Sequence, residues 1–178
     1  MRPENLRRNR HFWPPRLTRL PTGLRWSQPA VLLATWFGVG LIRPAAGSFG
    51  SAAAVPFLLL LAWVGGVASL AAAVTLLFAL GWWSSSLYAR VSRESDPSSV
   101  VIDEVFGLAL VMTMIPATAT AWIAGFLLFR FFDILKPFPI GWCDRHLKGG
   151  FGIMFDDGLA ALLAIACVWG IWSSLLMD

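Results

Sequence analysis

Long apolar segments separated by short polar ones dominate the chain, and they predict helices of membrane-spanning length. Between Arg43 and Arg90, 46 residues pass without an Asp, Glu, Lys or Arg, and an apolar run beyond about 18 residues is typical of a membrane span. The apolar run at residues 52–89 is 38 residues long and is interrupted by Gly65-Gly66. Because glycine weakens a helix at such a point, we expect a helical hairpin there.

The remaining apolar segments extend this pattern. Residues 100–129 predict a second hairpin with Pro116 near its turn, and residues 158–177 form an apolar run of 20 residues that matches one bilayer crossing. Residues 30–42 predict a short helix, and a loop of small residues follows at 43–51, with the next helix expected to begin at Ser51 or Ala52. The expected fold class is therefore all-α: an integral membrane bundle of roughly 4–6 helices, including short or re-entrant ones, with the number of crossings left open.

Composition and charge support a membrane protein. Of the 178 residues, 57% are hydrophobic and 13% are charged, whereas a soluble domain carries about 25% charged residues. Seven of the 14 basic residues lie in the first 25 positions, so we divide the chain into an Arg/Pro-rich tail at residues 1–28 and a single membrane-embedded domain at 29–178. The positive-inside rule places the amino terminus in the cytoplasm. The hydrophobic body gives no support to nucleic-acid binding by the tail, so we expect no nucleic-acid partner.

Two acidic pairs stand where an apolar segment begins. Asp103-Glu104 lies three residues into the segment that starts at Val100, and Asp156-Asp157 precedes the last predicted span. Ionised carboxylates at a membrane edge cost several kcal/mol unless water, a base or a metal compensates them. Each pair could also serve only as a helix-start signal. Two such pairs in one small bundle indicate a site for a hard cation such as Mg²⁺.

Basic residues that could bind phosphate lie in two further segments. Arg130, Asp133 and Lys136 follow an i, i+3, i+6 spacing, and Pro137 is expected to end that helix at Lys136. The two bases could clamp a phosphate, or they could form only an Arg–Asp pair and a snorkelling lysine. Backbone N–H groups of the loop at Gly47 and Ser48 could approach an anion, with Arg43 as a further phosphate contact.

Four segments, RPAAGSFGS, VIDEVFG, FRFFDILKPFPI and GGFGIMFDDGLA, occur in this order, and together they resemble the phosphatidylglycerophosphatase A family of bacterial membrane enzymes. The resemblance covers about residues 31–177. In that family the first segment usually reads P-x-A-P-G-T-x-G-S; here Ala46 replaces the second proline, and Ser48 replaces the threonine but keeps a hydroxyl.

The resemblance implies a Mg²⁺-dependent lipid phosphatase of phosphatidylglycerol biosynthesis, which acts on a phospholipid at the cytoplasmic face of the bacterial inner membrane as a multi-pass protein. It would remove the terminal phosphomonoester of phosphatidylglycerophosphate.

The implied metal ligands are Asp103, Glu104, Asp133, Asp156 and Asp157. The implied phosphate-binding groups are Arg130, Lys136 and Ser48, with Gly47 and Arg43 beside them. The catalytic set is Asp103, Glu104, Arg130, Asp133 and Lys136, with Asp133 favoured for a direct role because it lies between the two bases. The nucleophile is either a water activated by the metal or an aspartate that forms an acyl phosphate.

Other interpretations stay open at this stage. A small transporter or channel could use the intramembrane acids as an ion path, but its acids should then be spread through the bilayer depth. A structural subunit could use the charges only to pair helices, which would not explain why the acids come in adjacent pairs. A related enzyme could act on a different lipid or prenyl phosphate. The sequence identifies no protein partner.

Overall fold

The computed structural model describes residues 16–175, and it confirms the all-α fold class. Within this range the structure has six α-helices: α1 (Pro29–Ala34), α2 (Ala46–Ser92), α3 (Ile102–Met114), α4 (Ala119–Leu135), α5 (Ile140–His146) and α6 (Gly149–Leu175). A short 3-10 helix, η1, covers Val39–Leu41. Two residue pairs form the small antiparallel ladder of β1 (Arg16–Leu17) and β2 (Ile42–Arg43). The part of the predicted tail at residues 1–15 lies outside the described residues.

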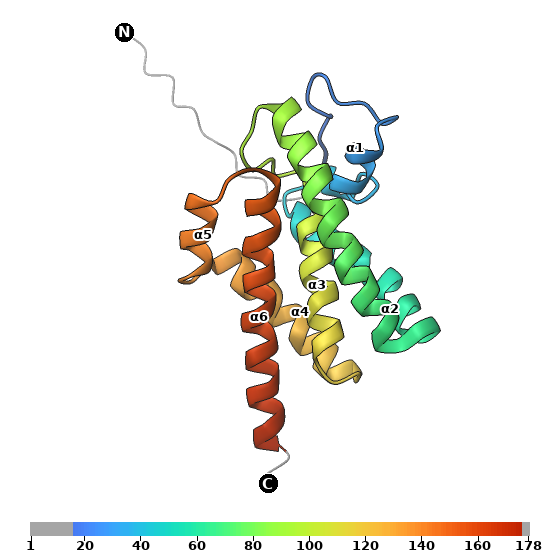
Figure 1. Ribbon diagram of the computed structural model, residues 1–178, viewed down its shortest axis with the longest axis vertical. Helices are drawn as coiled ribbons and strands as arrows, with labels where there is room; N and C mark the ends of the chain where they lie inside the picture. Colours follow the sequence, from blue (N-terminus) through green and yellow to red (C-terminus); the bar gives the residue numbers. More distant parts are fainter. Residues whose placement is uncertain (1–15, 176–178) are drawn as a thin grey trace.

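Helix α2 is a hairpin, as the glycine pair predicts. The chain reverses direction at Gly66 (Figure 1), which has the non-helical angles φ 59° and ψ −143°. The turn is tied to both legs by the Ser69 hydroxyl, which donates to the carbonyl oxygens of Leu61 at 2.5 Å and Gly66 at 2.8 Å. Backbone angles of this kind are essentially restricted to glycine, so Gly66 sets the place of the reversal.

Helix α3 is the centre of the bundle. Eight of its 13 residues are buried, and α2, α4 and α6 all pack on it. The predicted turn at Pro116 is confirmed, since α3 ends at Met114 and α4 begins at Ala119. The Thr118 hydroxyl caps α4 by accepting a hydrogen bond from the Ala121 amide. Helix α4 ends at Leu135, as Pro137 predicts.

Three helix boundaries differ from the predictions. The helix expected at 30–42 ends at Ala34, because Gly38 takes up a left-handed conformation and the Thr35 hydroxyl accepts a hydrogen bond from its amide. Helix α2 begins at Ala46 rather than Ser51 or Ala52, and α6 begins at Gly149 rather than Gly158. The glycines in these early turns permit close packing: a Cβ on Gly150 would meet the Ser86 side chain and the Trp82 carbonyl. They therefore stand inside helices, where the sequence suggested loops.

The segment at 16–28, which the sequence places in the tail, contacts the membrane-embedded domain. Arg16 is the ladder partner of Arg43, and Leu24 is buried in the common core. This segment lies at the end of the bundle where α2 and α3 begin (Figure 1). The remaining Lys and Arg residues of the described chain lie in or next to the polar segments at 90–101 and 130–148. The basic residues thus gather at one end, away from the turns at Gly66 and Pro116.

Two helices, α2 and α6, are long and apolar enough to cross a membrane. Large apolar side chains stand exposed along the legs of α2 and along α4, including Trp63 (84% exposed) and Ile123 (61% exposed). A bilayer accommodates such side chains, whereas water does not. The structure is therefore that of a membrane protein.

Replacing Gly66 by alanine should lower the apparent melting temperature of the detergent-solubilised protein. No atom would clash with the new Cβ, so the expected cost of about 1–3 kcal/mol comes from the backbone angles alone. Gly170→Ala is the matched control, because Gly170 is a helical glycine that also has open space around it; it should be neutral or stabilise the protein by up to about 1 kcal/mol. Equal melting temperatures for the two variants would contradict this role of Gly66.

Candidate active site

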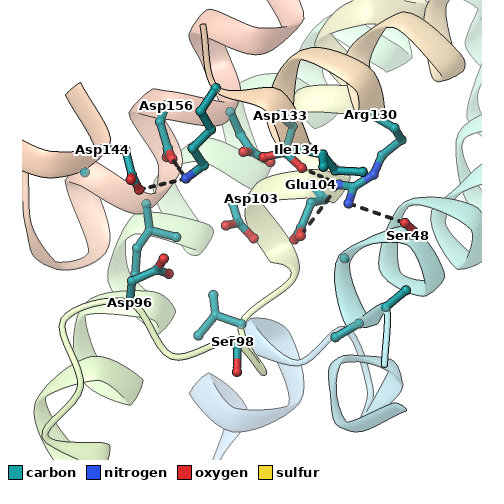
Figure 2. A pocket seen from close by; sticks show the side chains of 18 of the residues that line it. Ser48, Asp96, Ser98, Asp103, Glu104, Arg130, Asp133, Ile134, Asp144 and Asp156 are labelled. Carbon is teal, nitrogen blue, oxygen red and sulfur yellow. Dashed lines mark hydrogen bonds and ion pairs between the residues drawn. The ribbon is translucent and has the colours of Figure 1, made fainter. Parts of the chain in front are cut away.

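A polar cavity of about 320 Å³ lies at the basic end of the bundle. Its walls come from the first turn of α2, the segment between α2 and α3, the first turn of α3, the end of α4, α5 and the first turns of α6 (Figure 2). All ten residues that the sequence singles out line it: Arg43, Gly47, Ser48, Asp103, Glu104, Arg130, Asp133, Lys136, Asp156 and Asp157. The fold thus brings together segments that are far apart in the chain.

Three carboxylates form what we call the acid cluster: Asp103 and Glu104 from α3, and Asp157 from α6. One side-chain oxygen of each lies within 4.8 Å of the others. Each residue also has a buried oxygen without a hydrogen-bond partner among the described residues, namely Asp103 Oδ1, Glu104 Oε2 and Asp157 Oδ2. Buried carboxylate oxygens without partners are costly. A divalent cation bound by oxygen ligands would satisfy them, so the acid cluster fits a hard metal ion.

The helix-start interpretation fits one acidic pair better than the other. Asp103 and Glu104 do lie in the first turn of α3, but their unpartnered oxygens are buried, where headgroup water does not reach them. Asp156 and Asp157 lie two turns inside α6, so the alternative that they cap its N-terminus is wrong. Asp157 is only 2% exposed. Capping therefore does not explain why the last helix carries two acids.

Lys136 is held between two carboxylates. Its ammonium donates to Asp144 Oδ1 and to Asp156 Oδ2, both at 2.7 Å (Figure 2). Burial alone would lower the pKa of Lys136, but the two carboxylates outweigh burial and raise its pKa above the ordinary lysine value. Lys136 therefore stays protonated at physiological pH. Asp156, one of the predicted metal ligands, is paired with this base.

Arg130 is the second base held by acids. Its Nη1 lies 2.7 Å from Asp133 Oδ2 and 3.7 Å from Glu104 Oε1, so the predicted Arg–Asp pair is confirmed. Its Nη2 reaches the Ser48 hydroxyl at 3.5 Å (Figure 2). A Cβ on Gly47 would collide with Glu104 Oε1 and Arg130 Nη2. Glycine at this position thus lets the first turn of α2 approach the charged groups.

The start of α2 adds backbone donors to this side of the cavity. The Phe49 amide bonds to the Ala45 carbonyl, and the amides of Gly47 and Ser48, which precede it in the first turn, have no partner within the helix. Such a helix start attracts anions. Arg43 also lines the cavity, but it donates to the Ser98 carbonyl at 2.9 Å and to the Ser98 and Ser99 hydroxyls at 2.6 and 3.1 Å. Arg43 therefore fastens the segment between α2 and α3 to the site.

The structure adds four residues that the sequence reasoning left out of the site: Asp96, Ser98, Asp144 and Lys148. Asp144 and Lys148 fall in the polar stretch around α5, whose polarity was the available signal. With these residues, seven carboxylates and four basic side chains line the cavity. By formal charge the acids exceed the bases by three, which disfavours an anion, so added positive charge would favour the binding of phosphate.

Comparison with known proteins gives consistent results. The family model for phosphatidylglycerophosphatase A matches residues 32–172. Phosphatidylglycerophosphatase A of Haemophilus influenzae is 44% identical over 144 residues, which are 80% of this chain and 88% of the relative. Phosphatidylglycerophosphatase A of Escherichia coli is 35% identical over 148 residues, which are 82% of this chain and 85% of the relative. No solved structure matches the chain significantly.

In metal-free buffer with EDTA, Asp157→Asn should melt at a higher temperature than the unaltered protein. The substitution removes one of three crowded charges and relieves a buried unpartnered oxygen, a gain of about 1–3 kcal/mol. Asp96→Asn serves as the control, because Asp96 lines the same cavity but is exposed, and it should shift melting little. A lower melting temperature for Asp157→Asn than for Asp96→Asn would show that the carboxylates do not repel one another.

Proposed function

The chain belongs to the phosphatidylglycerophosphatase A family, and from that membership we propose that it hydrolyses the terminal phosphomonoester of phosphatidylglycerophosphate with Mg²⁺ as its cofactor. The products are phosphatidylglycerol and inorganic phosphate. The observation that carries the proposal is the acid cluster, with its buried unpartnered oxygens, beside two bases that are each fixed by carboxylates. A divalent metal together with phosphate-binding bases is what phosphoryl chemistry requires.

Asp103, Glu104 and Asp157 would hold the metal. When bound, Mg²⁺ would offset the excess of acids and withdraw charge from the phosphoryl oxygens. Asp133 and Asp156, which the family resemblance also implies as ligands, are occupied by Arg130 and Lys136. We assign these two acids the role of orienting the bases. Asp133 also keeps its candidacy for a direct role, because it lines the cavity with its carboxylate 2.7 Å from Arg130.

Arg130 and Lys136 supply positive charge from the chain itself. Uncatalysed hydrolysis of phosphate monoesters is extremely slow, and stabilisation of charge on the transferring phosphoryl group provides most of the enhancement. The guanidinium of Arg130 and the Ser48 hydroxyl face the same side of the cavity as the first amides of α2. These donors would bind the phosphoryl oxygens and hold the ester in one orientation.

The proposed orientation places this site at the cytoplasmic face of the bacterial inner membrane. The basic residues of the described chain gather at the site end, whereas the turns at Gly66 and Pro116 carry none. Under the positive-inside rule the basic end faces the cytoplasm. The gathering of acids at this end also disfavours a transporter or channel, whose acids would be spread through the bilayer depth.

Lys136→Ala and Asp156→Asn should each abolish phosphate release from phosphatidylglycerophosphate in mixed micelles. The first removes a phosphate-binding charge, and the second releases the lysine from its position. Arg145→Ala is the control, because Arg145 is an exposed base on α5 outside the cavity. If a variant retained more than about a tenth of the activity, the substituted residue would lower the activation free energy by less than about 1.4 kcal/mol. That residue would then be removed from the proposed site.

Metal removal should also abolish phosphate release, and added Mg²⁺ should restore it. Mg²⁺ should raise the melting temperature of the unaltered protein as well, because a ligand that binds the folded state stabilises it. Asp157→Asn should show neither the recovery nor the rise. Full activity after exhaustive treatment with EDTA would refute the metal dependence while leaving the substrate assignment intact.

A further inference from the structure

An apolar groove runs along the bundle between the first leg of α2 and α4, with α3 as its floor. Both flanking helices pack on α3 but scarcely contact each other. Two apolar cavities, of about 440 and 360 Å³, occupy the space between them, and both are lined by Leu59, Met112 and Trp122. Because they share these walls, we treat them as one groove.

We propose that this groove binds one acyl chain of the phospholipid substrate, an inference that rests on the proposed function. The first argument is its continuity with the polar cavity. Ala52 lies one helical turn beyond Ser48 on α2, and Phe126 lies one turn before Arg130 on α4. Residues four apart share one face of a helix. The groove therefore begins where the phosphate-binding side of the polar cavity ends.

The floor of the groove continues the site in the same way. Glu104, Leu108 and Met112 are spaced four apart along α3; the first lines the polar cavity and the other two line the groove. The change from charged to apolar lining thus occurs on three helices at the same level. A phospholipid has the same order of parts, with a charged headgroup followed by hydrocarbon.

The dimensions of the groove suit a hydrocarbon chain. From Ala52 to Gly66 the groove follows α2 for 14 residues, which is about 21 Å at 1.5 Å per residue. One leaflet of the hydrocarbon core is about 15 Å thick, half of the bilayer value. Over the same 21 Å a helix about 10 Å across would fill roughly 1,600 Å³, about twice the volume of the two cavities together. A narrow chain fits where a helix from another protein does not.

The walls allow a lipid to enter from the side. Leu59, Ile123 and Leu127 line the groove and are 43%, 61% and 61% exposed. These apolar side chains face the surroundings of the bundle, which in a membrane are the acyl chains of other lipids. An acyl chain can therefore reach the groove without leaving the bilayer.

The test compares Ala52→Phe with Ala53→Phe, two neighbouring exposed alanines of which only Ala52 lines the groove. Phosphate release from dioleoyl phosphatidylglycerophosphate is measured in mixed micelles. The deacylated headgroup, glycerophosphoglycerophosphate, is added as a competitor. Ala52→Phe should raise KM for the diacyl substrate at least about tenfold, a change of about 1.4 kcal/mol, and leave the inhibition constant of the deacylated competitor unchanged. Ala53→Phe should alter neither constant.

Leu127→Trp narrows the groove from its opposite wall and provides a second variant should Ala52→Phe fail to fold. It should reproduce the rise in KM. An unchanged KM in both groove variants would overturn the proposal, as would a parallel rise in the inhibition constant of the deacylated competitor, since the effect would then act on headgroup binding. Absence of phosphate release by the unaltered protein would instead refute the proposed function.

Discussion

The burial of carboxylates at one end of an apolar bundle is the constraint on which the site depends. A buried charge costs several kcal/mol unless it is paired, and the acids of the site fall into two groups in this respect. Asp156 and Asp133 are each paired with a base, which fixes Lys136 and Arg130 in the cavity. In the acid cluster, Glu104 lies 3.7 Å from Arg130, which Asp133 holds more closely, and each of the three acids keeps a buried oxygen without a partner among the described residues. Because these carboxylates are not fully paired, the site is suited to a metal ion. A bound metal ion would in turn attract a phosphate.

Small residues make this concentration of charge possible. Gly47 lets the first turn of α2 reach Glu104 and Arg130, and a Cβ on Gly107 would press on Phe129 and lie 3.3 Å from the Asp157 carbonyl. Gly107 follows the acid-cluster residues of α3 by one turn, so α3, α4 and α6 meet closely just below the site. Tight packing of apolar side chains around α3 thus determines how near the carboxylates come to one another.

The sequence predicts most of the fold because membrane helices are long and their breaks are local. The turns and the end of α4 are marked by Gly65-Gly66, Pro116 and Pro137. Glycine and proline act on the backbone locally, so their effect can be predicted from the segment in which they stand. Helices α2 and α6 begin earlier than the sequence predicts, because in a sequence the glycines that allow close packing look the same as glycines of a loop. The site residues were foreseen as a set, yet their division into paired and unpaired acids was not. That division depends on tertiary distances, such as that from Lys136 to Asp144, which no spacing along the chain encodes.

The groove and the polar cavity adjoin but open into different surroundings. The groove opens towards the hydrocarbon of the membrane, whereas the polar cavity is lined by exposed charged residues such as Asp96 and Lys148. In the proposed reaction the two products differ in the same way. The lipid product can diffuse away within the leaflet, while inorganic phosphate leaves towards water. The lipid product can therefore leave while phosphate is still bound, and the headgroup of the next lipid can bind once phosphate has left the cavity.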